Sequence, residues 1–337
     1  MRKNIVWLLL IILLVVGLWV WNKGRAVRSE REFLHNLSLA NKLFEEGNYS
    51  EALKLYETLL PRIEENRGEI FYRMGLCSYE LDDFLHAREY WAQTPESYKD
   101  RIDFYQADMV LREGNPERAR EMFLTWWQTY PEHPLREKVE KKIGKISEEM
   151  LYGDLPFPGS IEYEVKIGDS LYKIAKRFRT TVDLIMKKNK LKTIIIKPGD
   201  KLIVIPGKFS IEIDLSKHLL YLYYDNKLFK VYRIATGEGD KTPVGEFKVT
   251  DRLKNPVWYS DKGPIPPGSP ENLLGSRWIG LNVKGIGIHE AINPEDIGKS
   301  ITNGCIRMLK KDVEELYILV ARGTPVVIKN GRVSNEE

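Results

Sequence analysis

The chain has 337 residues, more than a single hydrophobic core usually serves, so two or three domains are expected. Its 52 basic and 48 acidic residues nearly balance and leave a formal charge of +4. No long block of lysine and arginine occurs, and this composition argues against a dedicated nucleic-acid-binding protein.

The amino end carries an apolar segment. Residues 5–21 are all apolar or glycine, and as a helix they would extend about 26 Å, which just reaches the length needed to cross a bilayer. Trp7, Trp19 and Trp21 lie toward the ends of this run, as in an interfacial aromatic belt. Because no small-residue cleavage site follows, the sequence favours an uncleaved membrane anchor over residues 1–28, with a cleaved signal peptide as the alternative.

The next region, residues 33–151, has a helical pattern that repeats. Ala52, Ala87 and Ala119 occupy equivalent places in three similar blocks and are 35 and 32 positions apart, close to the tetratricopeptide period of about 34. Each block follows a pair of turn-forming residues, namely Gly47-Asn48, Asp82-Asp83 and Gly114-Asn115. The region resembles about three tetratricopeptide-like repeats, an all-α architecture whose groove could bind a protein partner.

A linker rich in proline and glycine is expected at residues 152–162. Residues 163–206 then follow the order strand, helix, helix, strand, and the first helix has a capping residue before it. They resemble a LysM module, a small α+β (βααβ) fold. This resemblance implies binding to glycans that contain N-acetylglucosamine, in peptidoglycan or chitin. It places the sugar groove between a loop at about 194–197 and a first loop formed by Gly168, Asp169, Ser170 and Leu171.

From residue 209 onward, hydrophobic residues alternate with a period of two. Successive strands up to Ile234 are separated by short turns, and a last strand is expected at 326–328, which predicts a mainly-β domain. Residues 255–274 are rich in proline and glycine and are expected to form an irregular excursion that could cover a site. A helix is expected after Lys310, with Asp312 as a possible N-cap.

Two residues of this domain suggest a catalytic pair. Cys305 follows Gly304, which allows a tight turn before the sulfur, and His289 is predicted at a strand end. A cysteine attacks carbonyl carbon as a thiolate, so an ordinary thiol needs a base near pH 7, and His289 can supply it. Backbone N–H groups of Gly304 and Cys305 can stabilise an oxyanion, and Arg307 can hold a carboxylate. Singly, such a cysteine or histidine is more often a packing residue, whereas together they favour catalysis.

The same residues carry a family resemblance. His289 with the block Thr302-Asn-Gly-Cys-Ile-Arg-Met308, and Thr242-Pro-Val-Gly-Glu-Phe247 upstream, resemble the signature of the L,D-transpeptidase (YkuD) family over residues 209–330, which leaves 331–337 as a tail. The resemblance implies that Cys305 is the nucleophile and His289 the general base and acid. It places the oxyanion hole at backbone amides from Asn303 to Cys305, and a backbone carbonyl orients the histidine. The family commonly has histidine where this chain has Asn303.

The fold class expected is therefore multidomain: a transmembrane helix, all-α repeats, a LysM module and a mainly-β catalytic domain. The resemblance implies a bacterial single-pass membrane protein whose extracytoplasmic domain forms 3→3 cross-links between peptidoglycan stem peptides. Water as the acceptor would make it an L,D-carboxypeptidase, and a protein amine would make it an attachment enzyme. A further alternative is a non-catalytic wall-binding scaffold. We expect no cofactor, no metal and no nucleic-acid partner, and we expect Cys77 to be a packing residue.

Overall fold

The computed structural model describes residues 2–153, 157–261 and 263–331, with side chains described from residue 14 onward. The chain divides into two compact units, Met1–Glu113 and Gly114–Glu337. The expected LysM module and mainly-β domain both lie in the second unit, together with the last helices of the expected repeats.

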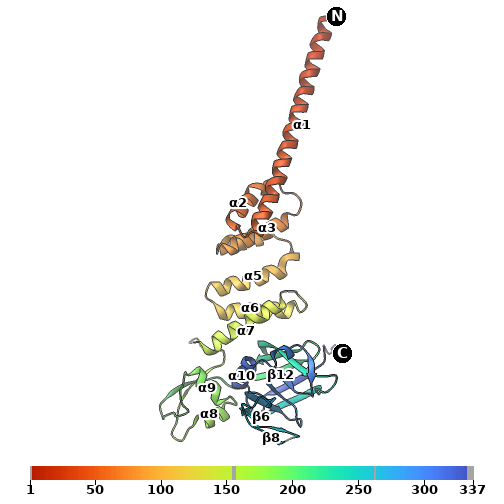
Figure 1. The fold of residues 1–337 in the computed structure, drawn as a ribbon. Helices are drawn as coiled ribbons and strands as arrows, with labels where there is room; N and C mark the ends of the chain where they lie inside the picture. The colour runs from red at the N-terminus through yellow and green to blue at the C-terminus, as the bar shows by residue number, and fades with distance from the viewer. Residues whose placement is uncertain (1, 154–156, 262, 332–337) are drawn as a thin grey trace, which may run out of the picture. The chain divides into compact units, whose positions relative to one another are not determined.

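The first unit is helical. Its long helix α1 (Arg2–Glu45) is continuous, so the apolar segment and the first helix of the repeat region form one element (Figure 1). The helices after it are α2 (Tyr49–Leu59), α3 (Arg67–Glu80), α4 (Phe84–Trp91) and α5 (Lys99–Arg112), with short 3₁₀ turns at Leu60–Arg62 and Glu96–Tyr98. Helices α2 and α4 begin where the repeated blocks begin, and Ala52 and Ala87 are fully buried. This confirms a helical region, because the turn residues end each helix at the predicted place.

The apolar run of the expected membrane anchor, residues 5–21, lies in part outside the described side chains. In the portion of the chain that the structure describes, no helix combines the length and the apolar character that crossing a bilayer requires.

Large side chains fill the core of the first unit. The indole N–H of Trp91 donates to the carbonyl of Tyr72 at 3.2 Å, and the ring lies where a side chain on Gly75 would be. Cys77 is fully buried, and this burial raises the pKa of its thiol to about 12. It is therefore a packing residue, as predicted.

The LysM region has the predicted order of elements: β1 (Ile161–Glu164), α8 (Leu171–Arg177), α9 (Val182–Lys188) and β2 (Lys201–Val204). Strands β1 and β2 pair antiparallel. Ser170 and Thr181 cap the two helices, because their hydroxyls accept hydrogen bonds from the N–H groups of Lys173 and Leu184. The βααβ fold is thus confirmed.

The C-terminal domain is mainly β. Its strands are β3 (Phe209–Asp214), β4 (Leu219–Tyr224), β5 (Lys227–Gly237), β6 (Gly245–Lys254), β7 (Trp258–Ser260), β8 (Gly263–Ile265), β9 (Arg277–Leu281), β10 (Gly287–Glu290), β11 (Ser300–Thr302), β12 (Ile306–Met308) and β13 (Pro325–Lys329). A 3₁₀ turn, Pro294–Asp296, precedes β11, and helix α10 (Lys310–Leu319) follows β12. Helix α10 begins after Leu309 rather than with Asp312 as its cap.

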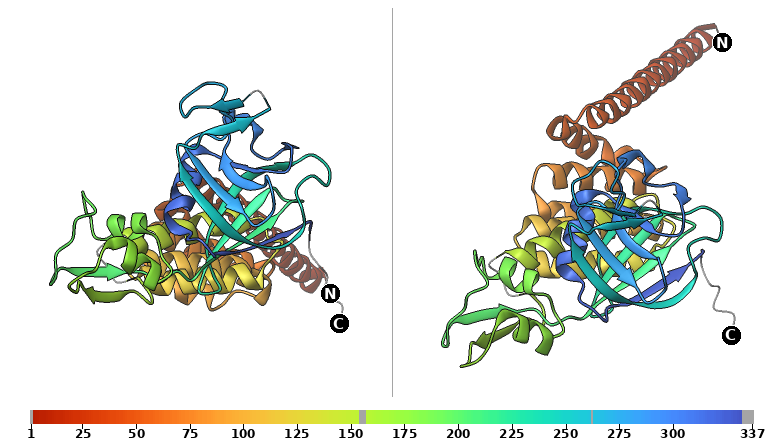
Figure 2. Two further views of the ribbon diagram at one scale, coloured as in Figure 1. Left: turned by 90° about the horizontal axis from the view of Figure 1, so that it is seen from below. Right: turned by 60° about the horizontal axis from the view of Figure 1, so that its bottom comes forward.

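The strands enclose a common core (Figure 2). Within the described residues, the main sheet has the order β11-β5-β12-β10-β9-β6-β13-β3-β4, and β5 also pairs β4, so the order closes on itself. The closure depends on the length of β5, whose first half pairs β4 and whose second half pairs β12 and β11. In the region predicted to be irregular, residues 258–260 and 263–265 instead form the short strands β7 and β8, which pair antiparallel.

Helices α6 (Pro116–Thr129) and α7 (Arg136–Tyr152) contact this domain along β5. Buried Arg120 of α6 donates to the carbonyl of Leu228 at 2.8 Å, and Glu148 of α7 pairs with Lys230. The LysM module attaches through α9, where the Thr181 hydroxyl donates to the carbonyl of Ile318. Asp183 of α9 also forms ion pairs with Arg252 and Lys254 of β6.

Candidate active site

The candidate catalytic residues lie on adjacent parallel strands. His289 belongs to β10, whose neighbour β12 starts directly after Cys305, and the register pairs His289 with Arg307. Because alternate residues of a strand face the same side, Cys305 and Arg307 share the face that carries His289. The two residues that the sequence predicts as a pair therefore lie on, or directly before, adjacent strands of the sheet.

A hydrogen bond to the backbone fixes the orientation of the His289 ring. Its Nδ1 atom lies 2.9 Å from the carbonyl oxygen of Glu290. A carbonyl oxygen only accepts hydrogen bonds, so this contact puts the proton on Nδ1 and leaves Nε2 with a free lone pair. The carbonyl that orients the histidine, which the sequence could not identify, is that of Glu290.

The surroundings keep His289 uncharged. Only 3% of the residue is exposed, and this burial, with the nearby charge of Arg307, lowers its pKa to about 4. Its ring also stacks on the indole of Trp278, with 5.9 Å between ring centroids. Near pH 7 the imidazole is therefore neutral and able to take a proton.

Cys305 is also uncharged at rest. Burial raises the pKa of its thiol, an effect opposed by a backbone hydrogen bond from Gly287 and by the charge of Arg307. The thiol donates to the carbonyl of Gly285, with 3.3 Å between sulfur and oxygen. A protonated thiol must lose its proton before or during attack, and a neutral imidazole is able to accept it as a general base.

Hydrogen bonds from Thr302 shape the catalytic turn, which we define as residues 302–305. Its buried hydroxyl donates to the carbonyl of Cys305 at 2.6 Å and accepts from the N–H of Gly304 at 3.2 Å. The Gly304 N–H, expected in the oxyanion hole, thus donates to Thr302 in this structure. Asn303 is exposed at the outside of the turn.

A second threonine fixes the turn from the opposite side. The hydroxyl of Thr242 donates to the carbonyl of Gly304 at 3.0 Å and accepts from the N–H of Gly237 at 2.8 Å. In the sequence, Thr242 is distinguished only by its place in the segment Thr242-Pro-Val-Gly-Glu-Phe247 that resembles the family signature. Since the contact joins residues 62 positions apart, no local pattern reveals it.

Arg307 already has a partner in the structure. Its Nη1 atom lies 2.8 Å from the Asp296 carboxylate, and both side chains are mostly buried. The sequence predicts that Arg307 holds a substrate carboxylate, but its Nη1 group already donates to Asp296. Its charge nevertheless acts on both His289 and Cys305.

Replacing Gly304 by alanine tests how closely the turn is packed. Gly304 has φ +115°, and a Cβ atom there would lie 2.6 Å from the carbonyl oxygen of Lys241 and 2.7 Å from Ile286 Cδ1. We expect Gly304→Ala to lower the free energy of unfolding by about 2 kcal/mol or more and to reduce activity, measured by thermal unfolding and a turnover assay.

Gly263→Ala is the matched control, because Gly263 has a similar positive φ (+108°) but open space around its Cβ position. Equal destabilisation by both substitutions would show that backbone strain, and not crowding around the turn, is the cause.

The LysM loops differ in part from expectation. The side chain of Leu171 is buried in the core of the module, so it does not face a ligand. The Asp169 carboxylate accepts hydrogen bonds from the Tyr163 hydroxyl and the Lys166 N–H, which holds the first loop together. Gly168 and Ser170 remain exposed. The second predicted loop contains the exposed side chains of Ile194 and Ile195, and the sequence did not single out exposed Ile167 and Tyr172, which flank the first loop.

Comparison with known proteins gives the same two modules. Residues 208–328 match the YkuD family, described as the L,D-transpeptidase catalytic domain, and residues 163–204 match the LysM domain. The chain is similar to the Bacillus subtilis protein named "Putative L,D-transpeptidase YqjB", with 41% identity over 40% of this chain and 78% of the relative. It is also similar to "Putative L,D-transpeptidase YkuD" of Bacillus subtilis, with 35% identity over 50% of this chain and 98% of the relative.

The assignment rests on these sequence relatives. Among solved structures, the catalytic domain of an Enterococcus faecium L,D-transpeptidase shares 27% identity, covers 36% of this chain and 98% of that chain, and gives a TM-score of 0.30. The sequence relatives are covered over most of their length and exceed 30% identity. The chain therefore belongs to the L,D-transpeptidase (YkuD) family.

Proposed function

We propose that the chain forms 3→3 cross-links in peptidoglycan through a thioester on Cys305. The observation that supports this proposal is the parallel pairing of β10 with β12, in which His289 and the residue after Cys305 belong to neighbouring strands. In the first step Cys305 Sγ attacks the carbonyl carbon of the third residue of a stem tetrapeptide while Nε2 of His289 takes the thiol proton. The C–N bond breaks, and D-alanine leaves with that proton on its amine.

In the second step a different nucleophile attacks the thioester, and the cysteine becomes the leaving group. An amine of a neighbouring stem attacks the thioester, His289 takes its proton, and the C–S bond breaks to return the proton to the thiol. Backbone N–H groups between Asn303 and Cys305 are the proposed donors to the oxyanion in both steps. For Gly304 this role requires its N–H to turn from the Thr302 hydroxyl to the substrate.

The products formed in cells test this proposal and separate it from its alternatives. Muropeptides isolated from cells that express the chain, and from cells that express Cys305→Ala, are compared by mass spectrometry. Dimers linked 3→3 that require Cys305 support the transpeptidase. Shortened stems alone would indicate an L,D-carboxypeptidase, protein-linked stems an attachment enzyme, and no difference a wall-binding scaffold.

We also propose that the LysM module holds the protein on the glycan strands. In its support, Ile195 lies in the second loop expected to form the sugar groove and is 75% exposed, and Ile167, directly before the first loop, is 91% exposed. Exposed apolar side chains gathered on recognition loops favour ligand contact over simple loop closure.

Replacing Ile167 and Ile195 by serine is expected to weaken retention on insoluble peptidoglycan at least about tenfold, because each buried isoleucine contributes about 1.5–3 kcal/mol. The measurement is co-sedimentation of the protein with purified sacculi. Leu85→Ser, which removes an exposed apolar side chain of α4, is the control. Undiminished retention in the double variant would contradict a groove between these loops.

For its location, we propose a single-pass membrane protein with the catalytic domain outside the cytoplasm. The apolar run of residues 5–21 supports this, and so do the contacts that follow it, Lys23 over the ring of Trp19 and Arg25 over the ring of Trp21. Such aromatic and basic residues suit the membrane interface. Retention in membranes after alkaline washing, and its loss on deleting residues 2–21, tests the proposal.

Finally, we propose that the helices between residues 33 and 151 act as tetratricopeptide-like repeats that bind a protein. Their support is the buried alanine at the same place in each second helix, Ala52, Ala87 and Ala119. Crosslinking in cells, with and without the first unit, tests whether a partner depends on these helices.

A further inference from the structure

The indole of Trp278 lies against the ring of His289. The two residues oppose each other across the antiparallel strands β9 and β10, with 5.9 Å between ring centroids and an angle of 29° between the ring planes. The next residues on the same face of these strands are Gly280 and Gly287, which also oppose each other. The indole therefore lies beside two positions that carry no side chain.

The place of the indole depends on these two glycines. A Cβ atom on Gly287 would lie 2.6 Å from Trp278 Cη2, and one on Gly280 would lie 2.9 Å from Trp278 Nε1. A larger residue at Gly287 would thus displace the indole from the ring of His289. Gly287 also forms a backbone hydrogen bond with Cys305, so the same glycine contacts both the indole and the catalytic cysteine.

Proton transfer creates a buried charge at His289. When the ring takes the thiol proton it becomes an imidazolium, and only 3% of the residue is exposed. Arg307 of β12 opposes this charge, whereas Glu290 favours it through its carbonyl at Nδ1 and through its carboxylate. That carboxylate already accepts a hydrogen bond from the N–H of Ser276 at 2.7 Å. Cys305 adds no lasting negative charge, because its electron pair forms the bond to the carbonyl carbon.

The face of the indole can stabilise this cation. An aromatic face is electrically negative and attracts a cation that lies within about 6 Å of the ring centroid, and tryptophan does so most strongly. The distance between Trp278 and His289 meets this condition. The attraction acts mainly on the charged ring, so it favours the state formed during the reaction over the resting state.

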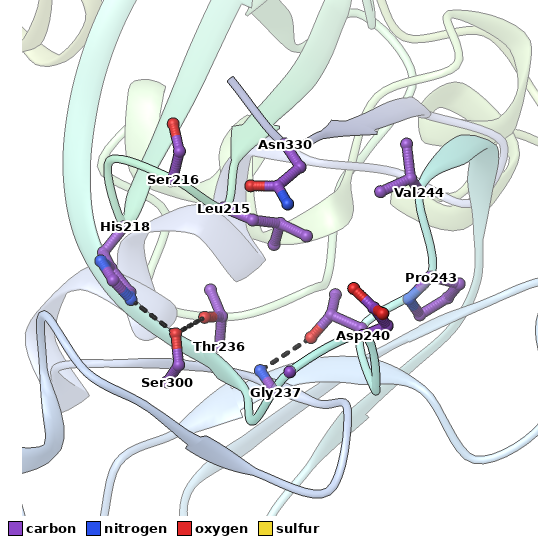
Figure 3. Close-up of a pocket in the computed structure, with 12 residues that line it drawn as sticks. Leu215, Ser216, His218, Thr236, Gly237, Asp240, Pro243, Val244, Ser300 and Asn330 are labelled. Carbon is purple, nitrogen blue, oxygen red and sulfur yellow. Dashed lines mark hydrogen bonds between the residues drawn. The ribbon is translucent and has the colours of Figure 1, made fainter.

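The other histidine of the catalytic domain shows a different way to hold a ring. Nε2 of His218 lies 2.9 Å from the hydroxyl of Ser300, which lies 3.2 Å from that of Thr236 (Figure 3). These residues line a separate polar cavity, whose lining includes neither His289 nor Trp278. A hydrogen bond at Nε2 orients an imidazole but occupies the nitrogen that a general base needs. Stacking orients His289 and leaves its Nε2 free.

We propose that Trp278 is a positioning residue for the general base, which holds the His289 ring against its indole and stabilises the imidazolium formed when the thiol gives up its proton. This inference rests on the proposed function, in which Nε2 takes that proton while the C–S bond forms. The same surroundings then keep the imidazole neutral at rest and stabilise it as a cation during attack.

Fluorinated tryptophans test the inference, because fluorine withdraws electron density from the indole face and hardly changes its shape. The chain has eight tryptophans, so each analogue is incorporated at all of them, both in the wild-type protein and in Trp278→Leu. Acylation of Cys305 by a carbapenem should slow with each added fluorine in the wild-type protein and stay constant in Trp278→Leu. The acid limb of the wild-type rate should also move to lower pH, because a less stabilised imidazolium gives His289 a lower pKa.

Substitutions give the size of the effect. Trp278→Leu should slow acylation about tenfold or more, and Trp278→Phe should slow it less, because phenylalanine keeps a weaker aromatic face. Trp127→Leu is the matched control, since it removes a half-buried indole of α6 that also lies under a cation, the guanidinium of Arg136. It should leave the rate unchanged, and thermal unfolding shows that each variant is folded.

A wild-type rate that does not respond to fluorination would overturn the inference, and so would an acid limb that moves to higher pH. Release of D-alanine from a donor stem tetrapeptide is measured in parallel. If the wild-type protein takes the carbapenem but releases no D-alanine, the proposed function fails, while the fluorination series still decides the role of Trp278. If the carbapenem does not react either, NMR titration of His289 decides it, since its pKa should be lower in the fluorinated protein.

Discussion

Cys305→Ala is expected to abolish the covalent adduct with a carbapenem and to lower kcat/KM for the donor peptide at least about a thousandfold. The reason is that the proposed thioester has no other nucleophile to form on, and removing a covalent nucleophile usually costs an enzyme this much or more. Intact-protein mass spectrometry detects the adduct, and D-alanine release gives the rate.

Cys77→Ala is the matched control for this experiment. The Cys77 thiol is fully buried, and its raised pKa, about 12, keeps it protonated, so it should neither react nor contribute to the rate. An adduct that persists in Cys305→Ala and disappears in Cys77→Ala would place the reactive thiol in the first unit and refute the active site described above.

His289→Gln is expected to slow acylation of Cys305 by about a hundredfold to ten-thousandfold. Glutamine can retain a hydrogen bond but cannot take the thiol proton, and the raised pKa of Cys305 leaves little thiolate without a base. The rate of carbapenem acylation by stopped-flow measurement reports this step alone. His86→Gln, at an exposed histidine of α4, is the control.

The pH dependence separates a base from a merely structural histidine. The buried imidazole has a pKa of about 4, so it loses its ability to take a proton only as the pH falls through that value. The acylation rate of the wild-type protein should therefore hold down to about pH 5 and then fall. The slow residual rate of His289→Gln should lack this acid limb, and an identical limb in the variant would exclude His289 as the base.

The sequence could predict the parts of this protein that depend on neighbouring residues. The helix starts at Tyr49 and Phe84 followed from turn pairs, and the order of elements in the LysM module followed from capping residues and periodicity. His289 and Cys305 were found because their spacing matches a signature. Each of these signals lies within a short stretch of chain.

The contacts that complete the site are long-range or involve the backbone. The Glu290 carbonyl orients His289, but every residue has a carbonyl, so its identity depends on the strand register. The bond between Thr242 and Gly304 and the pair formed by Arg307 and Asp296 depend on how the β-sheet and its loops close. Local sequence patterns do not reveal which residues meet through the tertiary fold. For this reason the sequence predicts an Arg307 guanidinium that is available to substrate, whereas in the structure it is paired with Asp296.

The attachment of α9 to the catalytic domain has a consequence for the pattern of cross-links. Because Thr181 and Asp183 join the LysM module to Ile318 and β6, the module is not a loose tether. If the module binds glycan as proposed, a strand seated in it lies at a fixed distance from Cys305. Stems recur at regular steps along such a polymer, so we expect cross-links to form at regularly spaced stems and not at random ones.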